Sequence, residues 1–108
     1  MLPQQTSTGY AVPMAESLTD QEIARALESL PGWKHEGGEI LKWYRFDGFP
    51  AAAAFIQGMV EPAERMSHHP DLECHERRVR VALHTWSQDA ITAKDIALAG
   101  EIERLAQG

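Results

Sequence analysis

Hydrophobic and polar positions follow two different periods along the chain, and each change of period marks the boundary of an expected element. Apolar residues first recur every three or four positions, in the set Ile23, Leu27 and Leu30. Thr19 and Glu22 form a T-x-x-E capping box ahead of this set, and Pro31-Gly32 stops it. This spacing predicts an amphipathic helix over residues 20–30.

After Trp33 the period falls to two residues, which is the period of a β-strand. Gly37-Gly38 separates two short runs and suits a tight hairpin turn, because glycine tolerates positive φ angles. In the second run one face carries Ile40, Lys42, Tyr44 and Phe46, and the other carries Leu41, Trp43 and Arg45. Apolar residues on both faces of this strand indicate a surface for oligomer formation. Alternation returns after Pro70 and continues to Trp86, which predicts a second hairpin.

Two further helices are expected. Pro50 leads into the run Ala51–Ala54, which favours a second helix over about residues 50–67, although Pro62 should kink this helix or loosen one turn. Thr92 can cap a last helix. The buried stripe of that helix comprises Leu98, Ile102 and Leu105. The order α-β-β-α-β-β-α predicts an α+β fold, in which a four-stranded antiparallel sheet is covered by helices.

The composition is that of one soluble globular domain. The chain has 108 residues, of which 44% are hydrophobic and 24% charged. A net charge of -6 argues against binding nucleic acid, and no apolar run approaches the roughly 20 residues of a membrane span. A single cysteine, Cys74, excludes an internal disulfide and favours a cytoplasmic location. Residues 1–16 are expected to be a disordered leader, and residues 17–108 the domain.

Candidate chemistry is concentrated between the second helix and the third strand. Glu64 and His68 are four residues apart, so both should lie on one helical face, where the carboxylate would hold the imidazole in one tautomer. His69 should point in another direction. Two imidazoles with different orientations can donate and accept protons on opposite sides of one substrate.

Two other interpretations remain open at this point. Consecutive histidines can simply cap a helix in solvent. A metal site is the second alternative, because the potential ligands here are Glu64, His68, His69, Asp71, Cys74, His75 and His84. Their spacing matches no zinc motif, and the side chains of residues 74 and 75 should point to opposite faces of a strand. The sequence therefore predicts no metal.

The series Glu64, His68-His69-Pro70, Trp86 and Asp95 resembles the signature of the pterin-4a-carbinolamine dehydratases, and the resemblance covers about residues 17–106. It implies a four-stranded antiparallel sheet backed by helices, assembled as a homodimer or homotetramer. It also implies loss of water from 4a-hydroxytetrahydropterin to give quinonoid dihydropterin, during recycling of tetrahydropterin. The pterin is then the substrate, and no metal or organic cofactor is implied.

By the same resemblance, His68 and His69 would assist removal of the N5 proton and departure of the 4a-hydroxyl group. The residues expected to bind the substrate or support the site are Glu64, Pro70, Asp71, Arg80, Trp86 and Asp95. Pro70 would fix the loop, and Trp86 is either an aromatic wall or strand packing. Arg80 stands where animal members carry a histidine. It is expected to pair with Asp95, to stack on the pterin ring, or to be a surface arginine.

A non-catalytic function is the main alternative. The same fold serves as a dimerisation cofactor for a transcription factor in animals and as a Rubisco assembly factor in some autotrophic bacteria. The retained His68-His69 pair favours the enzyme, whereas Glu76, in place of an expected aromatic, and Arg80 favour the assembly partner. An accessory role in molybdenum cofactor metabolism rests on analogy alone.

Overall fold

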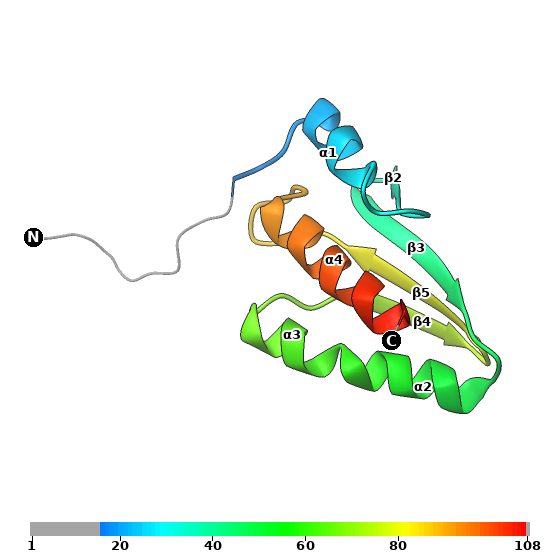
Figure 1. The fold of residues 1–108 in the computed structure, drawn as a ribbon. Coiled ribbons are helices and arrows are strands. Elements are labelled where there is room, and N and C mark those ends of the chain that lie inside the picture. The colour runs from blue at the N-terminus through cyan, green and yellow to red at the C-terminus, as the bar shows by residue number, and fades with distance from the viewer. Residues whose placement is uncertain (1–15, 108) are drawn as a thin grey trace, which may run out of the picture.

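The computed structural model describes residues 16–107, and their elements follow the predicted α+β order (Figure 1). Helix α1 and the first hairpin are followed by two consecutive helices, the second hairpin and a final helix. The bounds are α1 Asp20–Leu27, β2 Lys34–Glu36, β3 Glu39–Arg45, α2 Phe49–Gly58, α3 Val60–Arg65, β4 Asp71–His75, β5 Arg78–Leu83 and α4 Ala93–Gln107. The expected leader lies outside the described residues except for Glu16. No helix within residues 16–107 is long and apolar enough to cross a membrane.

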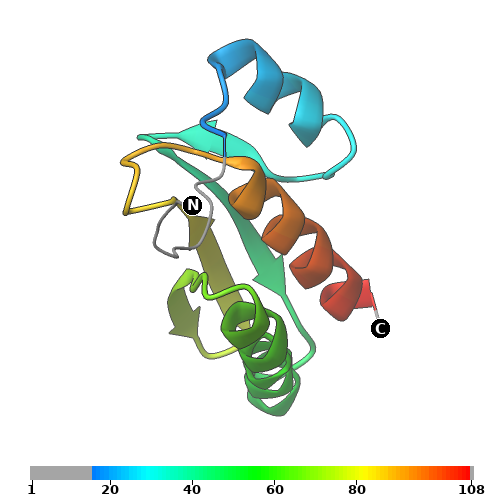
Figure 2. The same ribbon diagram turned by 90° about the vertical axis from the view of Figure 1, so that its left-hand side faces the viewer.

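The four strands form one antiparallel sheet in the order β2-β3-β5-β4. Helices α2, α3 and α4 lie on the same side of this sheet in both views (Figures 1 and 2). Alternate residues of the two central strands point toward these helices and are buried. The core residues of the sheet are Ile40, Tyr44, Val79, Val81 and Leu83, and those of the helices include Phe55, Leu98 and Ile102. The other face carries Trp43, which is exposed.

Helix α1 begins as its sequence predicts. The Thr19 hydroxyl accepts a hydrogen bond from the Glu22 backbone N–H at 3.1 Å, and the Glu22 carboxylate accepts one from the Thr19 N–H at 2.8 Å. The helix ends at Leu27, three residues before the predicted end at residue 30. There the bonding changes to the tighter i→i+3 pattern, since the Leu30 N–H donates to the Leu27 carbonyl. Gly32, at φ +85°, then reverses the chain.

The second predicted helix, over residues 50–67, is two helices. The break lies at Met59, which separates α2 from α3. Proline has no backbone N–H, so Pro62 cannot donate to the Gly58 carbonyl, and the helix loses one bond at this point. Regular bonding resumes where the Ala63 N–H donates to the Met59 carbonyl. The loosened turn attributed to Pro62 is therefore present, and the helical segment ends at Arg65 rather than at residue 67.

A polar cluster joins α4 to β3 within the core. The Glu103 carboxylate accepts hydrogen bonds from the Tyr44 hydroxyl at 2.6 Å, the Lys42 ammonium at 2.9 Å and the Trp33 indole N–H at 3.2 Å. Burial alone would raise the pKa of Glu103, but the bonds from Tyr44, Lys42 and Trp33 outweigh it and lower that pKa. Burial and the hydrogen bond to Glu103 raise the pKa of Tyr44. This cluster fixes α4 on the sheet.

Candidate active site

The first turn of α4 brings a buried carboxylate to His68. The backbone leaves α3 through Ser67, whose φ of +50° is left-handed, and the His68 N–H donates to the Ala63 carbonyl. This turn directs the imidazole under the start of α4, where the side chain is almost fully buried. His68 Nε2 lies 2.5 Å from Asp95 Oδ1, and Asp95 itself is 0% exposed.

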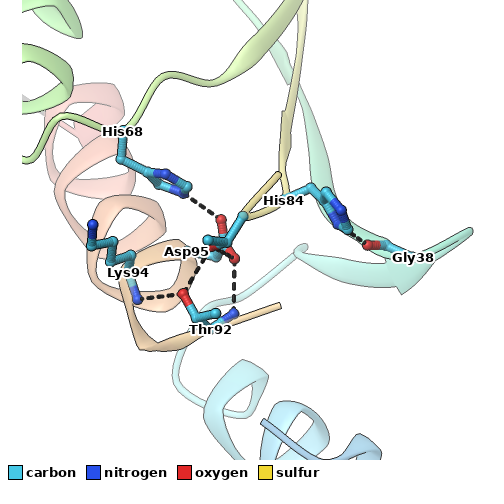
Figure 3. A network of polar contacts seen from close by, with 7 residues as sticks. Gly38, His68, His84, Thr92, Lys94 and Asp95 are labelled. Atoms are coloured by element: carbon cyan, nitrogen blue, oxygen red, sulfur yellow. Dashed lines mark hydrogen bonds and ion pairs between the residues drawn. The ribbon is translucent and has the colours of Figure 1, made fainter. Parts of the chain in front are cut away.

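Asp95 is held by the N-terminal turn of α4 and by the end of the second hairpin (Figure 3). Its Oδ2 accepts the Thr85 hydroxyl at 2.8 Å and the Thr92 backbone N–H at 2.9 Å. Thr92 is also the predicted cap, since its hydroxyl accepts the Lys94 N–H at 3.2 Å. With Oδ2 occupied by two donors, Oδ1 remains to accept His68 Nε2–H. The tautomer inferred from this bond leaves His68 Nδ1 for a substrate.

His69 has a different setting. Its Nε2 lies 2.6 Å from Glu64 Oε2, and the two side chains are 62% and 69% exposed. The predicted pairing of Glu64 with His68 is therefore wrong. The i,i+4 rule assumes a continuous helix, whereas α3 ends at Arg65 and the left-handed Ser67 turns His68 inward. Glu64 instead meets the next residue, at the rim.

A cavity of about 250 Å³ joins these two histidines to the segment that follows β5 and to the start of α4. Its lining consists of Ser67, His68, His69, His84, Thr85, Trp86, Ser87 and Lys94. Trp86 is 70% exposed, so its indole forms an outer wall rather than part of the core. A wall of this kind beside two imidazoles suits a flat heteroaromatic substrate on which protons are moved. A hollow of about 550 Å³ between α4 and the turn that follows α1 is larger, but no histidine lines it.

Sequence reasoning did not assign His84 and Lys94 to the acid/base site. His84 follows the last residue of β5, and its side chain is only 10% exposed. Two signals were present in the sequence. His84 lies two positions before Trp86 on an alternating segment, and Lys94 directly precedes Asp95.

Two predicted supporting residues lie outside this cavity. Arg80 pairs with Glu39 at 2.6 Å and with Glu73 at 3.7 Å on the sheet face that carries Trp43. The expected pairing of Arg80 with Asp95 is therefore wrong, because Asp95 belongs to a helix on the opposite face. The hydrogen bond to Glu39 raises the pKa of Arg80.

Asp71 is the first residue of β4 and is exposed on the same open face as Arg80, opposite Ala82. Pro70 connects His69 to this strand, so it stands where a fixed backbone would orient the double histidine. Within residues 16–107, no three His, Cys, Asp or Glu side chains come close enough together to hold a metal ion.

Comparison with known proteins extends over nearly the whole described region. Residues 16–105 match the family model for pterin 4 alpha carbinolamine dehydratase. A relative from Nocardia farcinica is 42% identical over 92 residues, which cover 85% of this chain and 97% of the relative. Its name proposes that it is a pterin-4-alpha-carbinolamine dehydratase.

Two solved structures share the architecture. A transcriptional coactivator/pterin dehydratase from Brucella melitensis superposes with a TM-score of 0.81 at 32% identity, covering 84% of this chain and 99% of the other. A pterin dehydratase-like protein, identified as a RuBisCO assembly factor in the alpha-carboxysome, gives a TM-score of 0.60 at 19% identity, covering 69% and 89%. The second likeness concerns the fold alone.

Proposed function

Because this chain belongs to the pterin-4a-carbinolamine dehydratase family, we propose that it catalyses the loss of water from a 4a-hydroxytetrahydropterin. One observation carries the proposal: two imidazoles with different carboxylate partners line one cavity that is walled by an indole. The cytoplasmic location and the homodimer or homotetramer stay predictions.

The dehydration needs two proton transfers. The N5–H bond breaks and its electron pair forms the N5=C4a double bond, while the C4a–O bond breaks and the hydroxyl leaves as water after gaining a proton. His68 and His69 can share these transfers, one as base and one as acid. General acid/base catalysis of this kind contributes about 10²–10⁴ in rate.

The two histidines are suited to different demands of this reaction. His68 is held rigidly, because Asp95 fixes its ring and the side chain is buried away from water. His69 is exposed at the rim, where it can exchange protons with solvent between turnovers. Trp86 supplies a flat surface against which the pterin ring would stack.

The test is the rate of 4a-hydroxytetrahydropterin dehydration with the purified protein, measured above the spontaneous rate. His68→Ala and His69→Ala should each lower the catalysed rate by about 10²–10⁴. His75→Ala is the matched control, because His75 is an exposed histidine on β4 that pairs with Glu73 and does not line the cavity. Its rate should equal that of the wild type.

A folded wild-type protein that gives no acceleration would overturn the proposal. The alternative, an assembly or dimerisation partner without catalysis, would then be favoured, as its fold is compatible with the RuBisCO assembly factor described above.

A further inference from the structure

His84 connects the cavity to a turn that is distant in the sequence but adjacent in the sheet. Its Nδ1 lies 2.7 Å from the carbonyl oxygen of Gly38, in the turn between β2 and β3 (Figure 3). A carbonyl oxygen only accepts, so Nδ1 carries the proton and donates this bond. Gly38 adopts φ +83°, the left-handed conformation that presents its carbonyl to the ring. The imidazole is therefore fixed although it follows the end of a strand.

The other contact of the His84 ring is with Trp86. The two rings meet edge to face, with centroids 4.6 Å apart and an interplanar angle of 69°. Trp86 lies in a turn with most of its surface exposed, a setting in which an indole ordinarily samples several rotamers. The fixed imidazole favours one of them, the rotamer in which the indole lines the cavity.

We propose that His84 is a positioning residue for substrate binding: held by the Gly38 carbonyl, its imidazole fixes Trp86 as the wall on which the pterin ring stacks. This inference rests on the proposed function and adds a binding role to a histidine outside the acid/base pair. A pre-ordered wall improves affinity because its ordering cost is met before the substrate arrives.

His84 differs from His68 and His69 in its contacts. Figure 3 shows its ring directed toward Gly38, while His68 points toward Asp95 from the other side. The second ring nitrogen, Nε2, lies 3.3 Å from Asp89 Oδ1, and the Asp89 side chain is 94% exposed. That long, solvent-exposed contact contributes little orientation. The bond to Gly38 and the packing on Trp86 therefore account for the function of the residue.

The values of KM and kcat distinguish a role of His84 in positioning Trp86 from a role in proton transfer. Loss of a complete aromatic stack costs about 5- to 150-fold in affinity. His84→Ala leaves Trp86 in place but mobile, so KM should rise by about 3- to 10-fold. Its kcat should remain within about twofold of the wild type, whereas His68→Ala lowers kcat. An unchanged KM, or a kcat as low as that of His68→Ala, would overturn the proposal.

Two substitutions separate the ring contact from the hydrogen bond. His84→Phe keeps an aromatic ring against Trp86 but loses the bond to Gly38. His84→Asn keeps a donor near the position of Nδ1 but loses the ring. If packing on the indole is decisive, His84→Phe restores KM more fully than His84→Asn. The reverse order would contradict the role assigned to Trp86.

A readout independent of activity keeps this inference distinguishable from the proposed function. The measurement is the NMR signal of the Trp86 indole N–H, which is assigned by its disappearance in Trp86→Phe. In His84→Ala this signal should shift and broaden, while the signals of Trp33 and Trp43 stay in place. An unmoved Trp86 signal would refute the positioning role.

Calorimetric titration with a stable dihydropterin measures binding directly. It therefore tests the positioning role even when the wild type shows no dehydratase activity. Binding weakened in His84→Ala would then support the positioning role while the catalytic proposal fails. Equal binding by both proteins, or none by the wild type, would overturn the inference.

Discussion

Replacing Asp95 with asparagine should reverse the proton pattern of His68. Oδ2 of the carboxylate accepts two donors, from Thr85 and from the Thr92 backbone, whereas Oδ1 faces His68 Nε2. An asparagine side chain has a single oxygen. That oxygen should keep the Oδ2 position, because both of its partners there are donors, and the NH₂ group then faces Nε2. His68 must turn Nε2 into an acceptor, so Nδ1 carries the proton toward the cavity.

Asp95→Asn should lower both kcat and the free energy of unfolding. With a proton already on Nδ1, His68 can no longer accept one at the nitrogen that faces the cavity, so kcat of Asp95→Asn should fall by about 10²–10⁴. The protein also loses charge-assisted character in three buried hydrogen bonds. Such bonds contribute about 1.5–3 kcal/mol each, and the amide retains part of them, so the free energy of unfolding should fall by about 1–3 kcal/mol.

Thr85→Val is the matched comparison. It removes the hydroxyl that donates to Asp95 Oδ2 and keeps the shape of the side chain, while Oδ1 and His68 are unchanged. This variant should lose a similar free energy of unfolding, about 1–3 kcal/mol, with kcat within about tenfold of the wild type. Urea denaturation and single-turnover kinetics measure the two quantities. Asp95→Asn with kcat near that of Thr85→Val would refute the orientation of His68 by the carboxylate.

Three further perturbations test other contacts of the structure. Glu64→Gln should lower kcat by less than about tenfold, because its pair with His69 is exposed to water. The lowered pKa of Glu103 contributes stability above the ordinary value of 4.5 that is lost as pH falls through the folded value, so the urea midpoints of wild type and Glu103→Gln should converge as the pH falls below 4.5. Gly32→Ala should destabilise by about 1–3 kcal/mol, because φ is +85° and a Cβ would lie 2.8 Å from Lys42 Cε.

Matched variants make these outcomes decisive. Gly37→Ala shares the positive φ of Gly32 but has open space around its Cβ, so the difference between the two isolates the crowding. Glu36→Gln replaces an exposed glutamate on β2 and should leave the acid dependence of the urea midpoint unchanged. Midpoints of wild type and Glu103→Gln that stay apart at acid pH would contradict the assignment of that dependence to Glu103.

Periodicity predicted the elements because burial on one face of a sheet imposes a period of two, and burial of one helix stripe imposes a period near four. The same alternation also predicts the face of the sheet on which Arg80 lies. It places Arg80 out of phase with the buried Val79 and Val81, and therefore on the face away from α4. The predicted pairing with Asp95 ignored that phase.

The error at Glu64 has a different origin. Its predicted pairing with His68 assumed that the helix continues, and no periodicity reports the left-handed φ of Ser67. His84 was named only as a potential metal ligand, and its contact with Gly38 was missed for a third reason. Its partner Gly38 is 46 residues away in the sequence, and only the antiparallel pairing of β3 with β5 brings the two together. Contacts made through tertiary structure leave no local signal.

A buried aspartate beside a histidine does not by itself indicate catalysis. Asp95 also closes the first turn of α4 and joins it to Thr85, and these bonds alone would account for a fully buried carboxylate. Catalysis is supported instead by side chains that the fold does not need: His69 contributes no buried contact, and Trp86 leaves most of its surface in water. A chain maintained for folding alone has little use for an exposed imidazole and an exposed indole around one cavity, so the strongest support for the dehydratase comes from these two residues together with the free nitrogen of His68.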